Sequence, residues 1–145
     1  MREVLFRGRR TDNDKWVEGF YLTSPEFDNI GIAVITADKP RHPHYVFKKT
    51  IGQYTGANDK NGNKIFEGDI ISIMFETDGI DGVSSYSWYE SAEVAFSEEK
   101  HAWIVVFNDG GEEMYLNEYN DVDDVYVIGN IWDEPKHLES EKRDV

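Results

Sequence analysis

The chain has 145 residues, of which 39% are hydrophobic and 14% aromatic, and it carries no cysteine and a formal net charge of −14 at pH 7. This length and apolar content suit one compact domain, or a barrel with a smaller subdomain, and exclude wholesale disorder. Without cysteine, disulfides and thiolate metal sites are excluded. No apolar run approaches the roughly 20 residues of a membrane helix. Residues 1–10 also lack the apolar core of a secretory signal, so we expect a cytoplasmic protein without membrane contact.

The charge is unevenly distributed along the chain. Residues 1–64 hold 11 Lys/Arg and 8 Asp/Glu, whereas residues 65–145 hold 4 and 21. A segment this acidic repels a phosphate backbone, which disfavours nucleic-acid binding by the second half. Three interpretations stay open: a surface for a basic partner protein, a mimic of nucleic-acid charge, or a solvated surface that maintains solubility. Arg7, Arg9 and Arg10 leave a nucleic-acid role for the N-terminal part as a further hypothesis.

The first half of the chain predicts short strands joined by turns. Thr11–Asp14 is turn chemistry, because Asp and Asn bond their own backbone and tolerate left-handed angles. Trp16–Leu22 predicts the return strand of a hairpin, rich in aromatic and β-branched residues. Ser24-Pro25 ends that strand, and Lys39–His44 predicts a proline-punctuated loop. The strands expected in this half are residues 4–8, 16–22, 30–35 and 45–47.

The second half begins with the strongest turn signal in the chain. Asn61-Gly62 is typical of a two-residue hairpin turn, and Gly68-Asp69 predicts a second break. Thr77–Ser91, rich in Gly, Ser and Asp, predicts a long mobile loop or hairpin tip. Residues 117–124 could hold one helical turn, and the segment from Pro135 predicts a frayed tail or a marginal short helix. The strands expected in this half are residues 70–75, 92–96, 102–107, 113–116 and 125–131.

Short strands at regular spacing favour a mainly β fold with a small barrel over any α/β layering. The barrel core is expected to draw on alternate apolar residues of these strands. They are Ile71, Ile73, Phe75, Val94, Phe96, Ile104, Val106, Tyr115, Val127 and Ile131.

Catalytic and metal chemistry find little support. His42 and His44 could offer two imidazoles to zinc, but no third ligand stands at motif spacing. A calcium loop starting at Asp59 would place Lys64 where glycine is needed and Ile70 where a bidentate glutamate is needed. The sequence as a whole contains no nucleophile elbow, phosphate-binding glycine loop or dinucleotide fingerprint. We therefore expect no enzyme activity, no cofactor and no bound metal.

Two groups of residues are candidates for binding a protein partner. Tyr86, Trp88 and Tyr89 could anchor a partner, because Trp and Tyr dominate interface hot spots. The alternative is that their loop folds back and buries them against the barrel. The second candidate is an acidic rim, which comprises Glu112, Glu113, Asp121, Asp123 and Asp124.

Six short motifs follow one another along almost the whole chain. They are Phe6-Arg-Gly-Arg-Arg10, Trp16-Val-Glu-Gly-Phe-Tyr21, Gly52-Gln-Tyr-Thr-Gly56, Asp59-Lys-Asn-Gly62, Ile65-Phe-Glu-Gly-Asp-Ile-Ile71 and Ile128-Gly-Asn-Ile131. In this order they resemble the YopX family of phage and prophage proteins.

This resemblance implies a C-terminal SH3-like barrel preceded by a smaller β-hairpin or sheet region. The domains are then residues 1–48, 49–135 and a tail at 136–145. No catalytic residues come with the family, and its motif positions are of types that tight turns require. These positions are Gly52, Tyr54, Gly56, Asp59, Gly62, Phe66, Gly68 and Asp69.

The function expected from all of this is a non-enzymatic protein-binding or assembly module in the host cytoplasm. Its partner is a protein, with a basic surface as one option, and exposed strand edges would also allow a homo-oligomer. The alternative is an acidic nucleic-acid mimic that inhibits a host DNA-binding protein.

Overall fold

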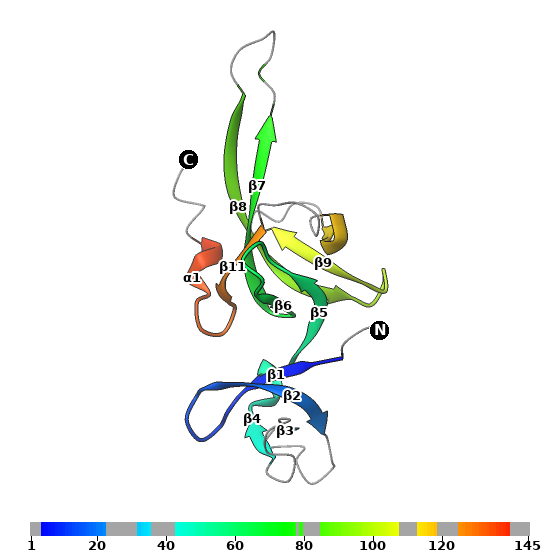
Figure 1. Cartoon of the computed structure of the whole chain (residues 1–145), viewed down its shortest axis with the longest axis vertical. Helices are drawn as coiled ribbons and strands as arrows, with labels where there is room; N and C mark the ends of the chain where they lie inside the picture. The colour runs from blue at the N-terminus through cyan, green and yellow to red at the C-terminus, as the bar shows by residue number, and fades with distance from the viewer. Residues whose placement is uncertain are drawn as a thin grey trace. The chain divides into compact units, whose positions relative to one another are not determined.

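The computed structural model describes residues 4–22, 32–35, 43–77, 79, 85–107, 113–118 and 125–139. Strands dominate these residues, as the sequence predicts, and all of the strand pairs are antiparallel. The chain divides into two units, Met1–Gly56 and Ala57–Val145. The boundary falls within one strand, β5 (Gly52–Asn58), which begins in the first unit and ends in the second (Figure 1).

The first unit is a small antiparallel sheet. It contains β1 (Phe6–Arg9), β2 (Trp16–Leu22), β3 (Ile32–Ile35), β4 (His44–Val46), a 3-10 turn η2 (Lys48–Thr50) and the first residues of β5. The sheet has six strands in the order β4-β3-β2-β1-β5-β6, and its last strand, β6 (Lys64–Phe66), belongs to the second unit. A further bridge, Arg10 to Val46, brings β4 against the residue that follows β1. The hairpin expected from Thr11–Asp14 is confirmed, because β1 pairs with β2 around it.

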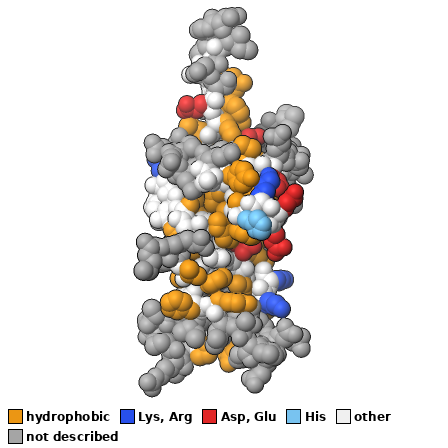
Figure 2. Space-filling view, turned by 90° about the vertical axis from the view of Figure 1, so that its right-hand side faces the viewer, with side chains coloured by type: hydrophobic (Ala, Val, Ile, Leu, Met, Phe, Trp, Pro, Cys, Tyr) orange, Lys and Arg blue, Asp and Glu red, His pale blue; other side chains and the backbone are white. Residues whose placement is uncertain are grey.

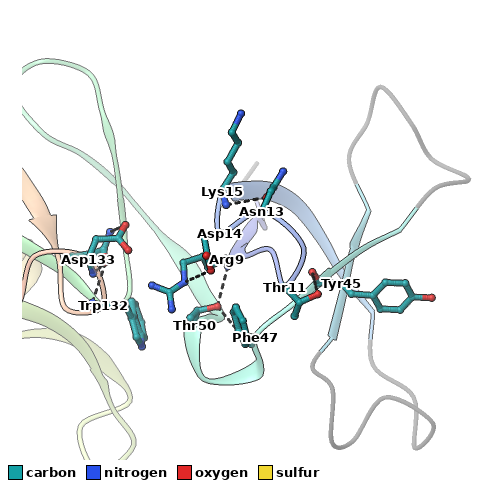
Figure 3. Close-up of polar contacts among 11 residues, drawn as sticks. Arg9, Thr11, Asn13, Asp14, Lys15, Tyr45, Phe47, Thr50, Trp132 and Asp133 are labelled. Carbon is teal, nitrogen blue, oxygen red and sulfur yellow. Dashed lines mark hydrogen bonds and ion pairs between the residues drawn. The ribbon is translucent and has the colours of Figure 1, made fainter.

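Val46 is the fully buried centre of this unit, packed against Val17 and Ile51. Gly8 leaves the space for it, since a Cβ at Gly8 would lie 2.7 Å from Val46 Cγ2. Buried Thr50 accepts a hydrogen bond from Arg9 N at 2.9 Å and donates one to Phe47 O at 2.6 Å (Figure 3). One side chain thus joins η2 to β1.

The second unit is built on a five-stranded sheet in the order β10-β9-β8-β7-β11. Its strands are β7 (Asp69–Thr77), β8 (Tyr86–Ser97), β9 (Ala102–Phe107), β10 (Met114–Tyr115) and β11 (Val125–Asn130). The short β6 (Lys64–Phe66), a 3-10 turn η4 (Leu116–Glu118) and one helical turn α1 (Lys136–Glu139) complete the unit. Among the described residues neither sheet of the protein closes into a barrel.

The core of the second unit confirms part of the expected list. Ile71, Ile73, Val94 and Ile104 are buried, and Phe75 and Val127 pack against the core while partly exposed. Val106 and Ile131 are also only partly buried. The alternation rule missed several core residues, which are Ile65, Ala92, Val105, Leu116 and Val125.

Two expected core residues were wrong, Phe96 and Tyr115, whose side chains are 43% and 40% exposed. Phe96 lies next to the last residue of β8, where the sheet ends, and its ring meets Trp103 edge-on at 5.1 Å. Tyr115 lies on the two-residue edge strand β10, with the Lys100 ammonium 5.4 Å from its ring centre. Alternation assigns a face of the strand, but it does not tell whether that position is covered.

Candidate protein-interaction site

The turn after β5 is organised by one nearly buried carboxylate, that of Asp59. Its Oδ1 accepts hydrogen bonds from the backbone N–H groups of Asn61 and Asn63, at 2.9 and 2.8 Å. Its Oδ2 accepts from the Asn63 side-chain amide at 3.2 Å and from Val127 N at 2.9 Å. Asp59 therefore holds its own turn and also fastens that turn to β11.

These contacts decide the charge state of Asp59 and its chemistry. Burial alone would raise the pKa of the carboxyl, but the hydrogen bonds from Val127, Asn63 and Asn61 outweigh it and lower the pKa below its ordinary value of 3.8. Both oxygens face N–H donors instead of an open coordination sphere. This arrangement is that of a structural turn and differs from a calcium loop, whose oxygens point at the ion.

The next turn depends on Gly68 and Asp69. Buried Asp69 accepts a hydrogen bond from Phe66 N through Oδ2 at 2.7 Å, which closes the turn between β6 and β7. Gly68 has φ of 88°, and a Cβ there would lie 2.2 Å from Trp132 Cζ3. The Gly68 backbone also donates to Val94 O at 2.8 Å and accepts from Ile131 N at 2.9 Å. Glycine is needed here both for its backbone angle and for the space that the indole occupies.

The other positions of the family motifs also serve the core or a turn. Gly52, Tyr54 and Phe66 are buried, whereas Gly56 and Gly62 have positive φ angles of 89° and 83° and open space around them. In the last motif, Asn130 Oδ1 accepts hydrogen bonds from Trp132 N and Asp133 N at 3.0 and 2.9 Å. These residues lie in turns and in the core.

The N-terminal arginines lie beside acidic and aromatic side chains. Arg10 donates two hydrogen bonds to Asp12, at 2.9 and 2.6 Å, and these bonds lower the pKa of the Asp12 carboxyl. Arg9 Nε lies 3.8 Å from Asp14 Oδ1 (Figure 3), and the Arg7 guanidinium lies 4.8 Å from the ring centre of Trp16. Arg9 and Arg10 thus have acidic neighbours, which weakens the case for a phosphate-binding surface.

The segment Thr77–Ser91, expected as a long mobile loop or a hairpin tip, is strand at Thr77 and at Tyr86–Ser91, while residues 78 and 80–84 lie outside the described residues. β7 continues to Thr77 and β8 begins at Tyr86, and the two pair directly from Thr77↔Tyr86 to Ile70↔Glu93. Among the described residues, β9 pairs with β8 from Ala92 onward, and β11 pairs with β7 up to Ile73. Residues 74–77 and 86–90 therefore form a two-stranded extension of the sheet, here called the ribbon, which Figure 1 shows projecting beyond β9 and β11.

A row of aromatic rings runs outward along one face of the ribbon. Phe75 lies 6.0 Å from Phe107 and packs against the core, Trp88 stacks on Phe75 at 5.7 Å, and Tyr86 follows at 5.6 Å from Trp88. Trp88 is 39% exposed and Tyr86 66% exposed. The row thus begins in the core and ends in solvent.

Tyr89, 52% exposed, lies opposite Met74 on the other face of the ribbon, because residues alternate along a strand. Hydrophobic side chains with an acidic one beside them are visible along this part of the molecule in Figure 2. A small open pocket is lined by Glu76, Ser85, Tyr86 and Ser87. The three aromatic residues singled out in the sequence are therefore gathered on the ribbon and exposed, and Phe75 joins them although the sequence assigned it to the core.

The acidic rim is not assembled by the described residues. Glu113 lies 3.5 Å from the Lys100 ammonium, so this carboxylate forms an ion pair. Glu112, Asp121, Asp123 and Asp124 lie outside the described residues. Among those that are described, no group of three Asp, Glu or His side chains could hold a metal ion. His42 also lies outside them, so the histidine pair stays a sequence-based hypothesis.

A second acidic feature, missed in the sequence, is the proximity of Glu93 and Glu67. Burial, and to a lesser degree the charge of Glu67, raise the pKa of the partly buried Glu93. A raised pKa means that the fold disfavours the ionised carboxylate, so stability increases as pH falls through that pKa and is reduced above it.

We expect Glu93→Gln to raise the thermal unfolding midpoint at pH 7, because the amide has no charge to desolvate or repel. Differential scanning calorimetry at pH 7 and at pH 4 measures this, and the gain should shrink at the lower pH. Glu99→Gln, at an exposed position in the turn after β8, is the control and should leave the midpoint unchanged. An equal gain from both variants would contradict the assignment to Glu93.

These features define a class of protein. Its fold is all-β, it exposes an aromatic ribbon, and its turns are organised by buried Asp and Asn side chains. A family model, described as YopX protein, matches residues 5–139, and the chain belongs to this YopX family. The suspected resemblance is thereby confirmed.

Among solved structures, the crystal structure of protein EF1440 from Enterococcus faecalis is similar over 95% of this chain and 99% of that one. The TM-score is 0.51 and the sequence identity 21%, so the likeness concerns the fold alone. No curated protein matches the chain. In the part of the chain that the structure describes, no helix is both long and apolar enough to cross a bilayer.

Proposed function

We propose that this YopX-family chain is a phage- or prophage-borne, non-enzymatic protein-binding module that acts in the host cytoplasm. The aromatic face of the ribbon, formed by Phe75, Trp88 and Tyr86, is its contact surface. The observation that carries the proposal is the exposure of Tyr86, Trp88 and Tyr89 on the part of β8 that pairs with β7 in the ribbon.

Energetics support a protein partner for this surface. Tyr and Trp are enriched among residues that contribute most to binding, because each buries a large rigid area at low conformational cost. The stacked row attaches to the core through Phe75, so the outer rings are held in place before a partner arrives. Preorganisation of this kind lowers the entropic cost of association.

The SH3-like barrel implied by the family for residues 49–135 is part of the same proposal. Its support is the core of the second unit, where Ile65 of β6 packs with residues of β7, β8, β9 and β11. Leu116 of η4 belongs to the same cluster. A short strand placed over a five-stranded sheet supplies the second layer that a small barrel requires.

Mutation of the aromatic row is expected to abolish partner capture and leave the fold intact. Immobilised wild-type protein and the Trp88→Ala and Tyr86→Ala variants would be incubated with extract of phage-bearing bacteria, and retained proteins quantified by mass spectrometry. A partner retained by wild type should fall by about tenfold or more with Trp88→Ala, as expected for an aromatic hot spot.

Tyr115→Ala is the matched control for this experiment. Tyr115 is 40% exposed, close to the value for Trp88, but it lies on β10 and outside the ribbon. Its removal should leave capture unchanged. Retention of the same proteins by wild type and Trp88→Ala, with both folded by circular dichroism, would refute the proposed surface.

The second candidate, a nucleic-acid mimic, is favoured by one observation, the charge of the second unit. Residues 57–145 hold 6 Lys/Arg and 22 Asp/Glu. A mimic would retain DNA-binding proteins at low salt and release them as salt rises. Capture that resists salt and depends on Trp88 supports the first proposal instead.

A further inference from the structure

The tip of the turn between β5 and β6 places an asparagine directly before a glycine, and both residues are exposed. Asn61 is the only asparagine of the sequence with a glycine after it. Gly62 has a φ of 83°, and a Cβ there would meet nothing within 4 Å. Hydrogen bonds from Gly62 N to Asp59 O at 3.0 Å and from Asp59 N to Asn63 O at 2.8 Å close the turn behind them. The pair is thus accessible to water at the end of a hydrogen-bonded turn.

An asparagine followed by glycine can react with its own backbone in water. The Gly62 nitrogen gives its proton to hydroxide and attacks the side-chain carbon Cγ of Asn61. The bond from Cγ to the side-chain nitrogen breaks, and ammonia leaves with a proton from water, so that a five-membered succinimide remains. Water then opens the ring at either carbonyl, which gives aspartate or isoaspartate at position 61. Glycine favours the attack, because it has no Cβ to hinder the approach.

The closed turn opposes the first step of this reaction. The proton that the Gly62 nitrogen must lose is the one it donates to Asp59 O, so the attack requires that this hydrogen bond break. The Asp59 carboxylate fixes the backbone on both sides, because its Oδ1 accepts from Asn61 N and Asn63 N at 2.9 and 2.8 Å. Its negative charge also disfavours a second one on the nearby deprotonated nitrogen. Reaction therefore requires an opening of the turn.

The isoaspartate product would change the turn permanently. Isoaspartate carries the main chain through Cβ and Cγ, which adds one carbon between position 61 and Gly62. The backbone N–H groups of positions 61 and 63 would then no longer be spaced to meet Asp59 Oδ1 together. Because Asp59 Oδ2 also accepts from Val127 N at 2.9 Å, the change would extend to the attachment of the turn to β11.

We infer that Asn61 is a site of spontaneous modification through a succinimide, and that the hydrogen bonds of Asp59 control its rate. While these bonds hold, Asn61 and Gly62 are kept from reacting. Each opening of the turn allows the attack, and the isoaspartate that results prevents the turn from closing in its original form. The site is independent of the ribbon and of the partner proposed for it.

The test follows the full chain during incubation at mildly alkaline pH, both folded and in guanidinium chloride. Peptide mapping by mass spectrometry quantifies conversion at Asn61, with Asn58 and Asn63 in the same digest as references, and an isoaspartate methyltransferase assay identifies the isoaspartyl product. In guanidinium chloride Asn61 should convert faster than both references. In the folded chain its conversion should be slower by about tenfold or more.

Two variants separate opening of this turn from unfolding of the whole protein. Asp59→Ala should accelerate the conversion of Asn61 in the folded chain about tenfold, because it removes the acceptor of two backbone donors. Gly68→Ala is the matched control. It strains the turn between β6 and β7 and leaves the bonds of Asp59 in place, so the rate should stay within about twofold of wild type.

Four outcomes would overturn the inference. Equal rates in the folded and the denatured wild-type chain would show that the turn exerts no control, and equal acceleration by Asp59→Ala and Gly68→Ala would assign the reaction to global unfolding. Aspartate without isoaspartate would exclude the succinimide. No conversion of Asn61 in guanidinium chloride would remove the site altogether.

Discussion

Replacing Gly68 by alanine is expected to lower the free energy of unfolding by about 3 kcal/mol. A left-handed backbone angle costs a residue with a Cβ about 1–2 kcal/mol, and overpacking costs about 1–3 kcal/mol more. The added Cβ would stand 2.2 Å from Trp132 Cζ3 at a φ of 88°. The indole would have to move away, while the Trp132 backbone is held by the hydrogen bond from its N–H to Asn130 Oδ1. Urea unfolding followed by circular dichroism measures the loss.

Gly62 is the matched control for this substitution. It has nearly the same φ, 83°, but a Cβ there would meet nothing within 4 Å. Gly62→Ala should therefore cost only the backbone term, about 1 kcal/mol. Equal losses for the two variants would mean that the contact with Trp132 contributes nothing.

Replacing Asp59 by alanine is expected to cost about 3 kcal/mol, because each buried donor left without an acceptor costs about 1–3 kcal/mol. The Val127 N–H, 68 residues away in sequence, would be one of these donors, because it now donates to Asp59 Oδ2 at 2.9 Å. Glu98→Ala, at an exposed turn position, is the control and should change stability little. A loss of similar size in both variants would contradict the role assigned to Asp59.

The same carboxylate predicts a pH dependence of defined sign. The pKa of Asp59 is lower in the folded protein than its ordinary value of 3.8, so its contribution to stability is complete above that value and disappears as pH falls through the folded pKa. Asp59→Asn should therefore be less stable than wild type at pH 6, and the difference should narrow below about pH 4. Urea midpoints measured from pH 6 to pH 3 would show the convergence, and a constant difference would refute the linkage.

Local chemistry predicted the strands and turns of this protein well. Trp16–Leu22 and Ala102–Phe107 coincide with β2 and β9, and the Asn61-Gly62 turn lies between β5 and β6. These segments combine strand-forming residues with strong terminating signals, so their identity depends little on the rest of the fold.

The ribbon could not be predicted in the same way. Residues 86–91 include two serines and a glutamate, which are not typical strand formers, and their pairing with β7 places them in a strand. The exposure of Tyr86 and Trp88 depends on which other segments cover this part of β8, which no local pattern encodes. The role of Asp59 was hidden for a related reason, because its fourth hydrogen-bond donor, Val127, lies far along the chain.

The long-range bonds that close the second unit have a consequence for how the chain acquires its structure. Val127 N reaches Asp59, and Ile131 N reaches Gly68 O, so the turns around β6 are completed only by residues near the C-terminal end. Contacts of such high sequence separation slow folding, since a long loop must close before they form. During synthesis on the ribosome, the turns around β6 would therefore be completed only after β11 has emerged.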